Sequence, residues 1–278
     1  MNAASQFLSQ AELTEIARKI RVSIVSMLTA AGSGHTAGAL GMVEIFTSLY
    51  FDRAKIDPSN PSWPDRDYIL LSAGHTCPVL YATLAEKGFF DKKELDTFRD
   101  INTRLQGHPH LHSLPGIEIT SGALGQGLSQ AVGMALGLQL DQKDNRVYCI
   151  MSDGEQQEGQ TWEAYMYAGD HSLSNLTAFI DRNHIQIGGN SNNVLPLNRL
   201  SEMIRSFGWE TITIDGHSFS ALHSAMDRAE QHEQPTAIIC ETTPGKGVSF
   251  IESDFEWHGK PPSEEELQRA LEELGVQS

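Results

Sequence analysis

The chain has 278 residues, of which 36 are acidic and 20 are basic, so its formal net charge is −16 at pH 7. This charge argues against a nucleic-acid surface, because no excess of Lys and Arg is present to neutralise phosphates. No apolar run approaches the roughly 18 residues of a membrane span, and the N-terminus lacks the pattern of a signal peptide. Cys77, Cys149 and Cys240 lack CxxC spacing, which predicts buried free thiols. We therefore expect a cytoplasmic protein that contacts neither nucleic acid nor membrane.

The first part of the chain predicts helices separated by one short strand. Ser9 and Glu12 form a capping-box pattern, and the apolar residues after them are spaced three and four apart. This pattern predicts a helix that ends in the glycine-rich turn at 31–35. Hydrophobic spacing then predicts an amphipathic helix at 42–51, a buried strand at 68–71 and a helix at 78–87.

Residues 122–140 carry no charge at all. This composition predicts a helix that is buried on most sides. Glycine weakens a helix, so the several glycines of this segment are expected where another backbone approaches closely.

The second half of the chain predicts strands that alternate with helices. Short apolar or β-branched runs occur at 147–151, 176–180, 211–214 and 237–240, and a second capping box, Ser263 with Glu266, begins the last helix. This alternation predicts an α/β fold with a doubly wound, mostly parallel sheet flanked by helices. No repeat or linker divides the sequence, so we expect a single domain over residues 1–278.

Two of these strands end in polar residues of a particular kind. Asp153 and Gly154 follow the first run, and Asn183 follows the second. Neighbouring parallel strands would bring the carboxylate and the amide oxygen to the same edge of the sheet, where such sheets bind ligands. Both groups are hard oxygen donors that suit Mg²⁺ or Ca²⁺. Considered alone, however, an Asp-Gly pair after a strand is more often an ordinary turn.

Four histidines, His35, His75, His108 and His258, each have a glycine beside them in the sequence. A glycine neighbour allows the ring to lie on a turn, open to a ligand. One such histidine is usually a solvated side chain, whereas four in one chain favour a functional set. The remaining histidines are interpreted as surface or structural residues: His110, His112, His171, His184, His217, His223 and His232.

With these motifs together, the chain resembles the N-terminal, diphosphate-binding third of transketolase, a thiamine-diphosphate enzyme. The resemblance implies the thiamine-diphosphate-binding fold and a diphosphate-binding domain. The matching blocks occur in family order over about residues 10 to 270, at 33–42, 71–75, 107–109, 120–127, 153–159, 181–187 and 257–259.

The resemblance also implies roles for individual residues. Asp153, Asn183 and the carbonyl oxygen of Ile185 match the family's metal ligands. Gly154 matches the position where a backbone N–H meets the diphosphate, and His75 matches a histidine beside the cofactor.

The resemblance further implies which residues surround the cofactor ring and the sugar. Leu124 and Ile187 match the apolar packing around the ring, and His258 matches a histidine that contacts the diphosphate or lies beside the thiazolium. His35, His108 and His258 match histidines that line the ketose channel, where imidazole can exchange protons with sugar hydroxyls near neutral pH. These three are the expected catalytic residues. An acidic residue near the subunit interface is matched by Glu158.

Some positions differ from the family pattern. Ser152 stands where glycine is usual, and Arg182 stands where Asp or Asn is common, which adds a cation near the metal site. His110 replaces a frequent acidic residue, and Lys246 lies in a flexible loop that is either solvated or in contact with a phosphate. These differences put the sugar specificity in doubt, not the binding of the cofactor.

The resemblance implies a partner chain. In transketolase, a pyrimidine-binding domain supplies the carboxylate that activates the cofactor, and the chain has no room for that domain after residue 258. We therefore expect the N-terminal subunit of a two-chain transketolase that transfers a two-carbon ketol unit from a ketose phosphate to an aldose phosphate. The assembly would contain two copies of each chain. The alternatives are a subunit of a deoxyxylulose-phosphate synthase or 2-oxoacid dehydrogenase, and a non-catalytic cofactor-binding subunit.

Overall fold

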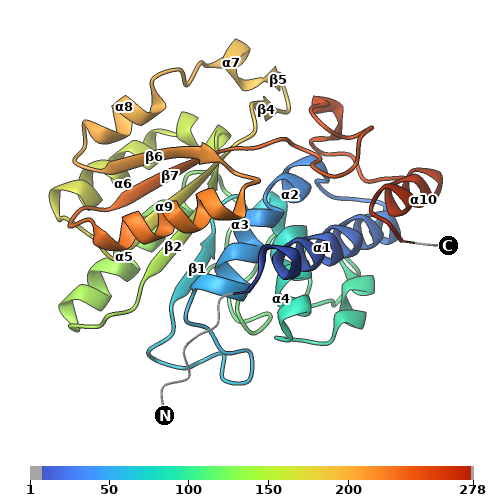
Figure 1. Cartoon of the computed structure of the whole chain (residues 1–278), viewed down its shortest axis with the longest axis horizontal. Coiled ribbons are helices and arrows are strands. Elements are labelled where there is room, and N and C mark those ends of the chain that lie inside the picture. The colour runs from blue at the N-terminus through green and yellow to red at the C-terminus, as the bar shows by residue number, and fades with distance from the viewer. Residues whose placement is uncertain (1–7, 277–278) are drawn as a thin grey trace.

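The computed structural model describes residues 8–276, which build a parallel five-stranded sheet with helices on both faces (Figure 1). The strand order is β1-β2-β3-β7-β6. All neighbouring pairs in this sheet are parallel. The strands are β1 Tyr68–Leu71, β2 Val147–Ser152, β3 Leu176–Arg182, β7 Thr236–Glu241 and β6 Glu210–Asp215. The predicted α/β class and parallel sheet are confirmed.

The register of the central strands sets the position of the polar residues that follow them. Ser152 is the partner of Asp181, and Arg182 is the partner of Glu241. The chain therefore leaves β2, β3 and β7 at the same edge of the sheet. That edge brings together segments that are far apart in the sequence.

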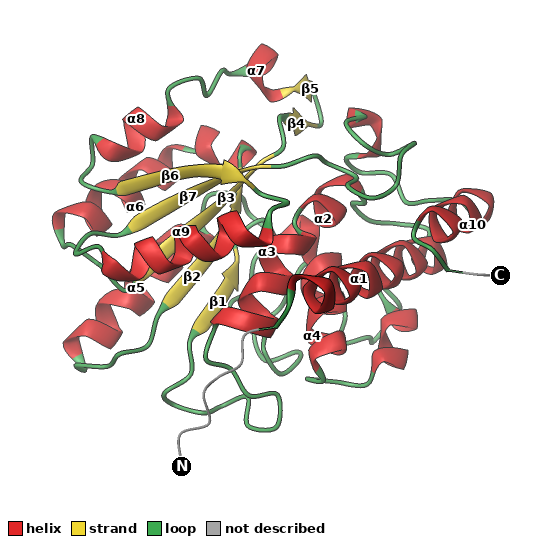
Figure 2. Ribbon diagram, viewed as in Figure 1, coloured by secondary structure: helices red, strands yellow, loops and turns green. Residues whose placement is uncertain are grey.

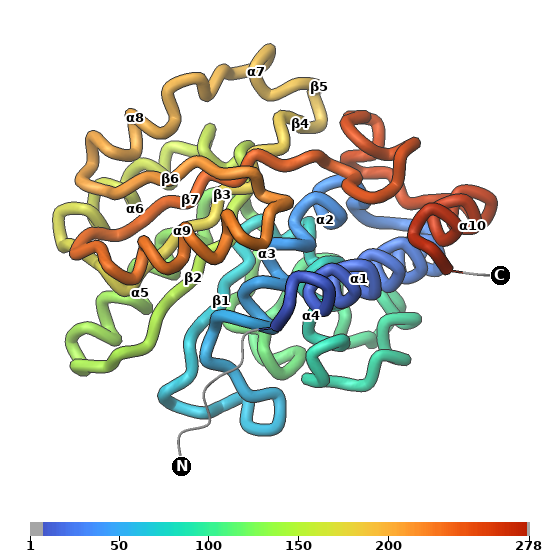
Figure 3. The backbone as a smooth tube through the Cα atoms, viewed as in Figure 1, coloured from blue at the N-terminus to red at the C-terminus, as the bar shows by residue number. Residues whose placement is uncertain are grey.

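Two apolar layers cover the sheet, one on each face (Figure 2). The helices of the larger layer are α1 Gln10–Ala31, α2 Ala37–Gly41, α3 Val43–Ser48, α4 Cys77–Lys87 and α9 Phe219–Gln231. The helices of the smaller layer are α5 Gly127–Leu140, α6 Gly159–Asp170 and α8 Leu200–Arg205. Figure 3 shows the last helix, α10 Glu264–Glu273, beside α1, so the last helix of the chain packs on the first.

Short elements fill the connections between the main helices and strands. A small antiparallel hairpin, with α7 after it, lies beyond the carboxyl ends of the strands (Figure 1). Its parts are β4 Ile185–Gln186, β5 Gly189–Asn190 and α7 Ser191–Val194. Single 3₁₀ turns occur at Gly74–Thr76, Lys92–Thr97, Gly154–Gln157 and Phe255–Trp257.

Several local predictions are confirmed. Both capping boxes form, Ser9 with Glu12 at α1 and Ser263 with Glu266 at α10. The three cysteines are buried free thiols. Within residues 8–276, no helix is both long and apolar enough to cross a membrane.

Two predicted helices differ from the structure. The predicted helix at 42–51 is an α-helix only to Ser48 and continues as a π-helical turn, Leu49–Arg53. In the uncharged segment, α5 begins at Gly127, and it is not buried on most sides. Leu140 is 74% exposed, because the sheet covers only one side of the helix.

The glycines of α5 also behave differently from one another. Gly127 permits close packing as expected, since a Cβ there would lie 2.3 Å from the Cβ of Ser72. Gly133 and Gly137 have no atom within 4 Å of an added Cβ. No backbone of the described chain therefore approaches these two glycines.

Candidate functional site

A cavity of about 200 Å³ opens at the carboxyl edge of the sheet. It lies where β2 and β3 end and where the segments after α1, β1 and β7 converge. Nearly all residues predicted for the site line it: His35, His75, Leu124, Asp153, Gly154, Glu158, Asn183, Ile185, Ile187 and His258.

His108 is the predicted site residue that does not line this cavity. Its side chain is exposed on the loop before α5. It lies beside the loop that carries Leu124, because a Cβ on Gly122 would be 3.6 Å from the His108 ring. A charge on His108 would act on both His35 and His75, which it helps to keep neutral.

Asp153 is a buried carboxylate at the end of β2, with 1% of its surface exposed. Its Oδ2 accepts hydrogen bonds from the backbone N–H of His184 at 3.1 Å and from the hydroxyl of Ser191 at 3.0 Å. Burial raises the pKa of Asp153 above its usual value, although these two hydrogen bonds oppose the shift. A cation beside this carboxylate would offset the cost of burying its charge.

Asn183 is oriented by another buried carboxylate. Its side-chain N–H donates to Oδ2 of Asp181 at 2.6 Å, and its Oδ1 accepts from the backbone N–H of Ile185 at 3.0 Å. Asp181 also accepts a hydrogen bond from the hydroxyl of Thr242. Burial, together with the nearby charge of Asp153, raises the pKa of Asp181 to about 7. Two carboxylates that repel each other in a buried site favour binding of a divalent cation.

The oxygen donors of this site fit Mg²⁺ or Ca²⁺ better than they fit a metal that needs several His, Cys, Asp or Glu side chains as ligands. Within residues 8–276, no group of three or more His, Cys, Asp or Glu side chains could hold a metal. Asp153, Asn183 and the carbonyl of Ile185 are instead oxygen donors of mixed kinds. Mg²⁺ is commonly bound by one or two carboxylates together with substrate phosphates and water.

Three histidine rings meet in the same cavity. The ring centroids of His35 and His75 are 4.9 Å apart, and each lies 5.5 Å from the ring of His258. Burial, and then the charges of neighbouring histidines, lower the pKa of His35 to about 4 and that of His75 to about 3. Burial also lowers the pKa of His258. All three rings are therefore neutral at pH 7, and each can accept a hydrogen bond from a ligand.

The local sequence explains how His35 reaches the cavity. Helix α1 ends at Gly32, which adopts a left-handed conformation with φ 57°. Gly34 has φ 136°, and a Cβ there would lie 2.3 Å from Cδ2 of Leu28. Only glycine tolerates this combination of backbone and contact. The Nδ1 atom of His35 is buried without a hydrogen-bond partner in the described chain, so it is available to a ligand.

The loop around Gly154 leaves space for an anionic group. A Cβ on Gly154 would find only the Ser152 hydroxyl, at 3.9 Å, within 4 Å. The space beside this backbone is therefore cavity. Ile187 is 85% exposed in the β4–β5 hairpin, and it borders the cavity from the outside.

A sequence profile described as "Transketolase, thiamine diphosphate binding domain" matches residues 13–278. The chain belongs to the transketolase family. It is 42% identical, over 95% of its length and 97% of the relative's, to the 6-deoxy-6-sulfo-D-fructose transketolase subunit SqwG of a Clostridium species. It is 36% identical to an apulose-4-phosphate transketolase subunit of Phocaeicola vulgatus, over 95% of each chain.

The solved structure of a transketolase from Campylobacter jejuni confirms the fold class. It superimposes with a TM-score of 0.92 and 32% sequence identity over 97% of this chain. This chain spans only 44% of that transketolase. The family resemblance inferred from the motifs is thus confirmed for the diphosphate-binding part.

Some residues of this transketolase-family site were missed in the sequence. Glu155 is fully buried directly after Gly154, where it accepts hydrogen bonds from the backbone N–H groups of Gly125 and Ser152, each at 2.9 Å. It also accepts a hydrogen bond from the Ser72 hydroxyl. Glu155 therefore ties the loop that carries Leu124 to the strand ends. An acidic residue directly after Asp-Gly was the available signal.

Asp181, Arg99 and His184 were also missed or interpreted otherwise. Asp181 lines the cavity, although its position within an apolar strand gave only a weak signal. The positive charge of Arg99 helps to lower the pKa of both His35 and His108. His184, interpreted as surface or structural, hydrogen-bonds Asp153 through its backbone N–H.

Two departures from the family pattern lie outside the cavity lining. The Nε atom of Arg182 is 3.5 Å from Oε1 of Glu241, so its charge is paired with that carboxylate. The ammonium group of Lys246 lies 3.8 Å from Glu252. Neither side chain forms part of the wall that Asp153 and Asn183 build.

Proposed function

We propose that this chain is the N-terminal, diphosphate-binding subunit of a two-chain transketolase. The enzyme transfers a two-carbon ketol unit from a ketose phosphate to an aldose phosphate. The observation that carries this proposal is the cavity, which is lined both by oxygen donors for a divalent cation and by three neutral histidines. The two relatives of matching length, which are named as parts of transketolases, support it.

In this proposal, Asp153, Asn183 and the carbonyl of Ile185 hold Mg²⁺ or Ca²⁺, which neutralises diphosphate oxygens in a protein of net charge −16. The backbone N–H of Gly154 and the ring of His75 bind the diphosphate itself. When bound, thiamine diphosphate supplies the electron sink that cleavage of a carbon–carbon bond beside a carbonyl requires.

The remaining site residues act on the ring of the cofactor and on the sugar. Leu124 and Ile187 exclude water from the ring, and His258 lies where the ring and the sugar meet. His35, His108 and His258 exchange protons with sugar hydroxyls or hydrogen-bond them, which general acid–base catalysis requires near neutral pH.

We propose that the partner chain carries the pyrimidine-binding domain and completes the site. The exposed side of α5 supports this requirement, since Gly133, Gly137 and Leu140 form an uncharged stripe at helical spacing. Glu158, exposed at the rim of the cavity, would face the partner. Closed symmetry favours two copies of each chain.

The fold supports one diphosphate-binding domain over residues 1–278, because both apolar layers pack on the same sheet. The names of the relatives favour ketol transfer over a deoxyxylulose-phosphate synthase, a 2-oxoacid dehydrogenase or a non-catalytic subunit. Those names also differ in the sugar, one being a sulfonated ketose and the other a ketose phosphate.

The test is co-expression with a chain that carries a pyrimidine-binding domain, encoded beside this one. The complex is assayed with thiamine diphosphate and Mg²⁺ on ketose phosphates, 6-deoxy-6-sulfofructose and apulose 4-phosphate. We expect release of a shortened aldose only when both chains and an acceptor aldose are present. Decarboxylation of a 2-oxoacid without ketol transfer would contradict the proposal.

A further inference from the structure

His258 is the last residue along the chain that lines the cavity. It lies in a long irregular segment, residues 242–260, which we call the His258 segment. The helical content of this segment is a single short turn, Phe255–Trp257. Its backbone must therefore be held in place by contacts with the rest of the molecule.

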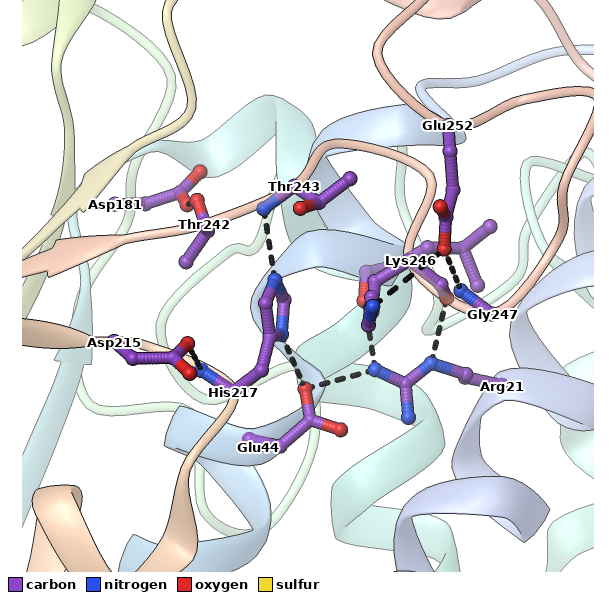
Figure 4. A network of polar contacts seen from close by, with 11 residues as sticks. Arg21, Glu44, Asp181, Asp215, His217, Thr242, Thr243, Lys246, Gly247 and Glu252 are labelled. Atoms are coloured by element: carbon purple, nitrogen blue, oxygen red, sulfur yellow. Dashed lines mark hydrogen bonds and ion pairs between the residues drawn. The ribbon is translucent and has the colours of Figure 1, made fainter.

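The start of the His258 segment rests on a buried polar network (Figure 4). The backbone N–H of Thr243 donates to Nε2 of His217 at 2.8 Å, and Nδ1 of His217 lies 3.0 Å from Oε2 of Glu44. The same carboxylate oxygen accepts from Arg21 at 2.8 Å. Arg21 in turn donates through Nε to the carbonyl of Lys246 at 2.7 Å.

Two backbone groups of the segment thus converge on one carboxylate through different side chains. Thr243 reaches Glu44 through His217, and Lys246 reaches it through Arg21. These three side chains are between 8% and 13% exposed. Further contacts support the same segment, because Gly245 donates to the carbonyl of Ala37 at 2.8 Å.

The geometry also defines the chemical state of His217. A backbone N–H can only donate, so Nε2, which accepts from Thr243, carries no proton. The ring must then carry its proton on Nδ1 and donate it to Glu44. A doubly protonated ring could not accept the hydrogen bond from Thr243. His217 therefore works as a neutral link between a backbone donor and a carboxylate.

We propose that His217, together with Glu44 and Arg21, positions the His258 segment so that the His258 ring lies against His35 and His75. The consequence for turnover depends on the proposed function, whereas the placement of the segment does not. His217 is a positioning residue, because it lies outside the cavity lining and acts through Thr243.

The experiment compares His217→Leu with His217→Gln. Leucine removes both polar links, whereas the glutamine amide retains one acceptor and one donor and should restore much of the link. His223→Leu is the matched control, because His223 is a partly buried histidine of α9 that pairs with Asp52, away from the segment.

The first measurement uses the full chain labelled at histidine, with ring NMR signals assigned by single substitutions. His217→Leu is expected to shift the signals of His35, His75 and His258, and to speed amide hydrogen exchange of the His258 segment about 10-fold. His217→Gln and His223→Leu should leave both close to the parent chain. A folded His217→Leu variant with unchanged His258 signals and unchanged exchange would overturn the proposal.

A replacement variant and an activity measurement complete the experiment. If His217→Leu does not fold, His217→Asn replaces it, because asparagine is too short to reach both Glu44 and Thr243. In the two-chain enzyme, His217→Leu should lower kcat and His217→Gln should restore it. If the parent two-chain enzyme does not bind thiamine diphosphate, the proposed function fails, and the NMR and exchange comparison still decides the positioning role.

Discussion

Asn183 donates a 2.6 Å hydrogen bond to the buried carboxylate of Asp181. This bond identifies which end of the Asn183 amide is nitrogen, and it directs the oxygen away from Asp181. Oxygen is the atom that a magnesium site needs. Asp181 therefore contributes to the proposed metal site by orienting a ligand.

The metal assignment predicts loss of cofactor binding without loss of the fold. Asp153→Asn and Asn183→Ala should each strongly weaken Mg²⁺-dependent binding of thiamine diphosphate, because the first replaces the anionic ligand with a neutral one and the second removes the amide ligand. Asp153→Asn should not lower the melting temperature without metal, since it removes a buried charge that is costly to desolvate. Calorimetric titration of the two-chain enzyme and thermal unfolding measure the two effects.

The control for these variants is Asp170→Asn, which changes an exposed carboxylate on α6. It should retain the parent affinity for the cofactor. Near-normal affinity in Asp153→Asn or Asn183→Ala would show that the metal ligands lie elsewhere.

The histidine assignments predict a separation of binding from turnover. His35→Ala and His108→Ala should bind thiamine diphosphate normally and lose about 10²–10⁴ in kcat with ketose phosphates, because each removes a proton-transfer or hydrogen-bond partner of the sugar. Steady-state kinetics and cofactor titration provide the two readouts. His108→Ala is the stricter test of the two assignments, since His108 lies outside the cavity lining. Unchanged kcat and KM in His108→Ala would remove it from the substrate channel.

The lowered pKa of His75 predicts a dependence of stability on pH. The folded state binds a proton on His75 only near pH 3, whereas the unfolded chain does so below about pH 6.5. Protons therefore favour the unfolded state in this window, and the free energy of unfolding falls as pH decreases from 6.5 towards 3. Replacing His75 removes this penalty.

Urea unfolding of the parent chain and of His75→Gln tests this sign. Relative to the parent, His75→Gln should gain stability between pH 7 and pH 5, by up to about 2 kcal/mol at pH 5. A difference that stays constant from pH 7 to pH 5 would mean that His75 is not buried as a neutral ring.

Substitution of Glu155 is expected to have a large effect on stability, although Glu155 is assigned to neither the metal nor the sugar. In Glu155→Gln, the amide N–H₂ must face one of the backbone donors that the carboxylate accepts. One buried donor is then left unpaired, which should destabilise the fold by about 1–3 kcal/mol. Urea unfolding measures this change. Glu158→Gln, three residues later and exposed, should change stability by less than about 0.5 kcal/mol.

The sequence predicted the strands and loops near the site better than it predicted which of them meet in the folded chain. The ends of β2 and β3 follow from apolar runs that stop at Asp153 and before Asn183, and parallel pairing then places both at one edge. His35 and His258 come from opposite ends of the chain, and their contact depends on tertiary packing that no local pattern encodes. For these histidines, only the family resemblance indicated a shared site.

The exposure of α5 was mispredicted for a physical reason. The sequence of an uncharged, glycine-rich helix does not reveal whether the outer side of the helix packs in the core of its own chain or against another chain. Hydrophobicity favours removal of an apolar surface from water, but it does not identify which molecule covers that surface. The open space at Gly133 and Gly137 is therefore information that only the structure provides.

That open space leads to the prediction about the partner. In Gly137→Glu, the new Cβ meets no atom of the described chain within 4 Å. The substitution also improves helix propensity, so the isolated chain should gain about 0.5 kcal/mol of stability or remain unchanged. If the uncharged side of α5 is buried in the assembly, the same carboxylate must be desolvated there, which should weaken association strongly. Analytical ultracentrifugation of the mixed chains measures the assembly.

The activity assay completes this prediction. Without its partner, the parent chain should show no ketol transfer with excess thiamine diphosphate and Mg²⁺, because the activating carboxylate is expected on the partner. Adding the partner should restore activity to the parent chain and much less to Gly137→Glu. Lys143→Gln, a change at an exposed residue in the loop after α5, lowers the net charge by the same one unit and controls for the change in charge. Turnover by the isolated parent chain would refute the two-chain enzyme, whereas full assembly of Gly137→Glu would refute only the assignment of α5 to the interface.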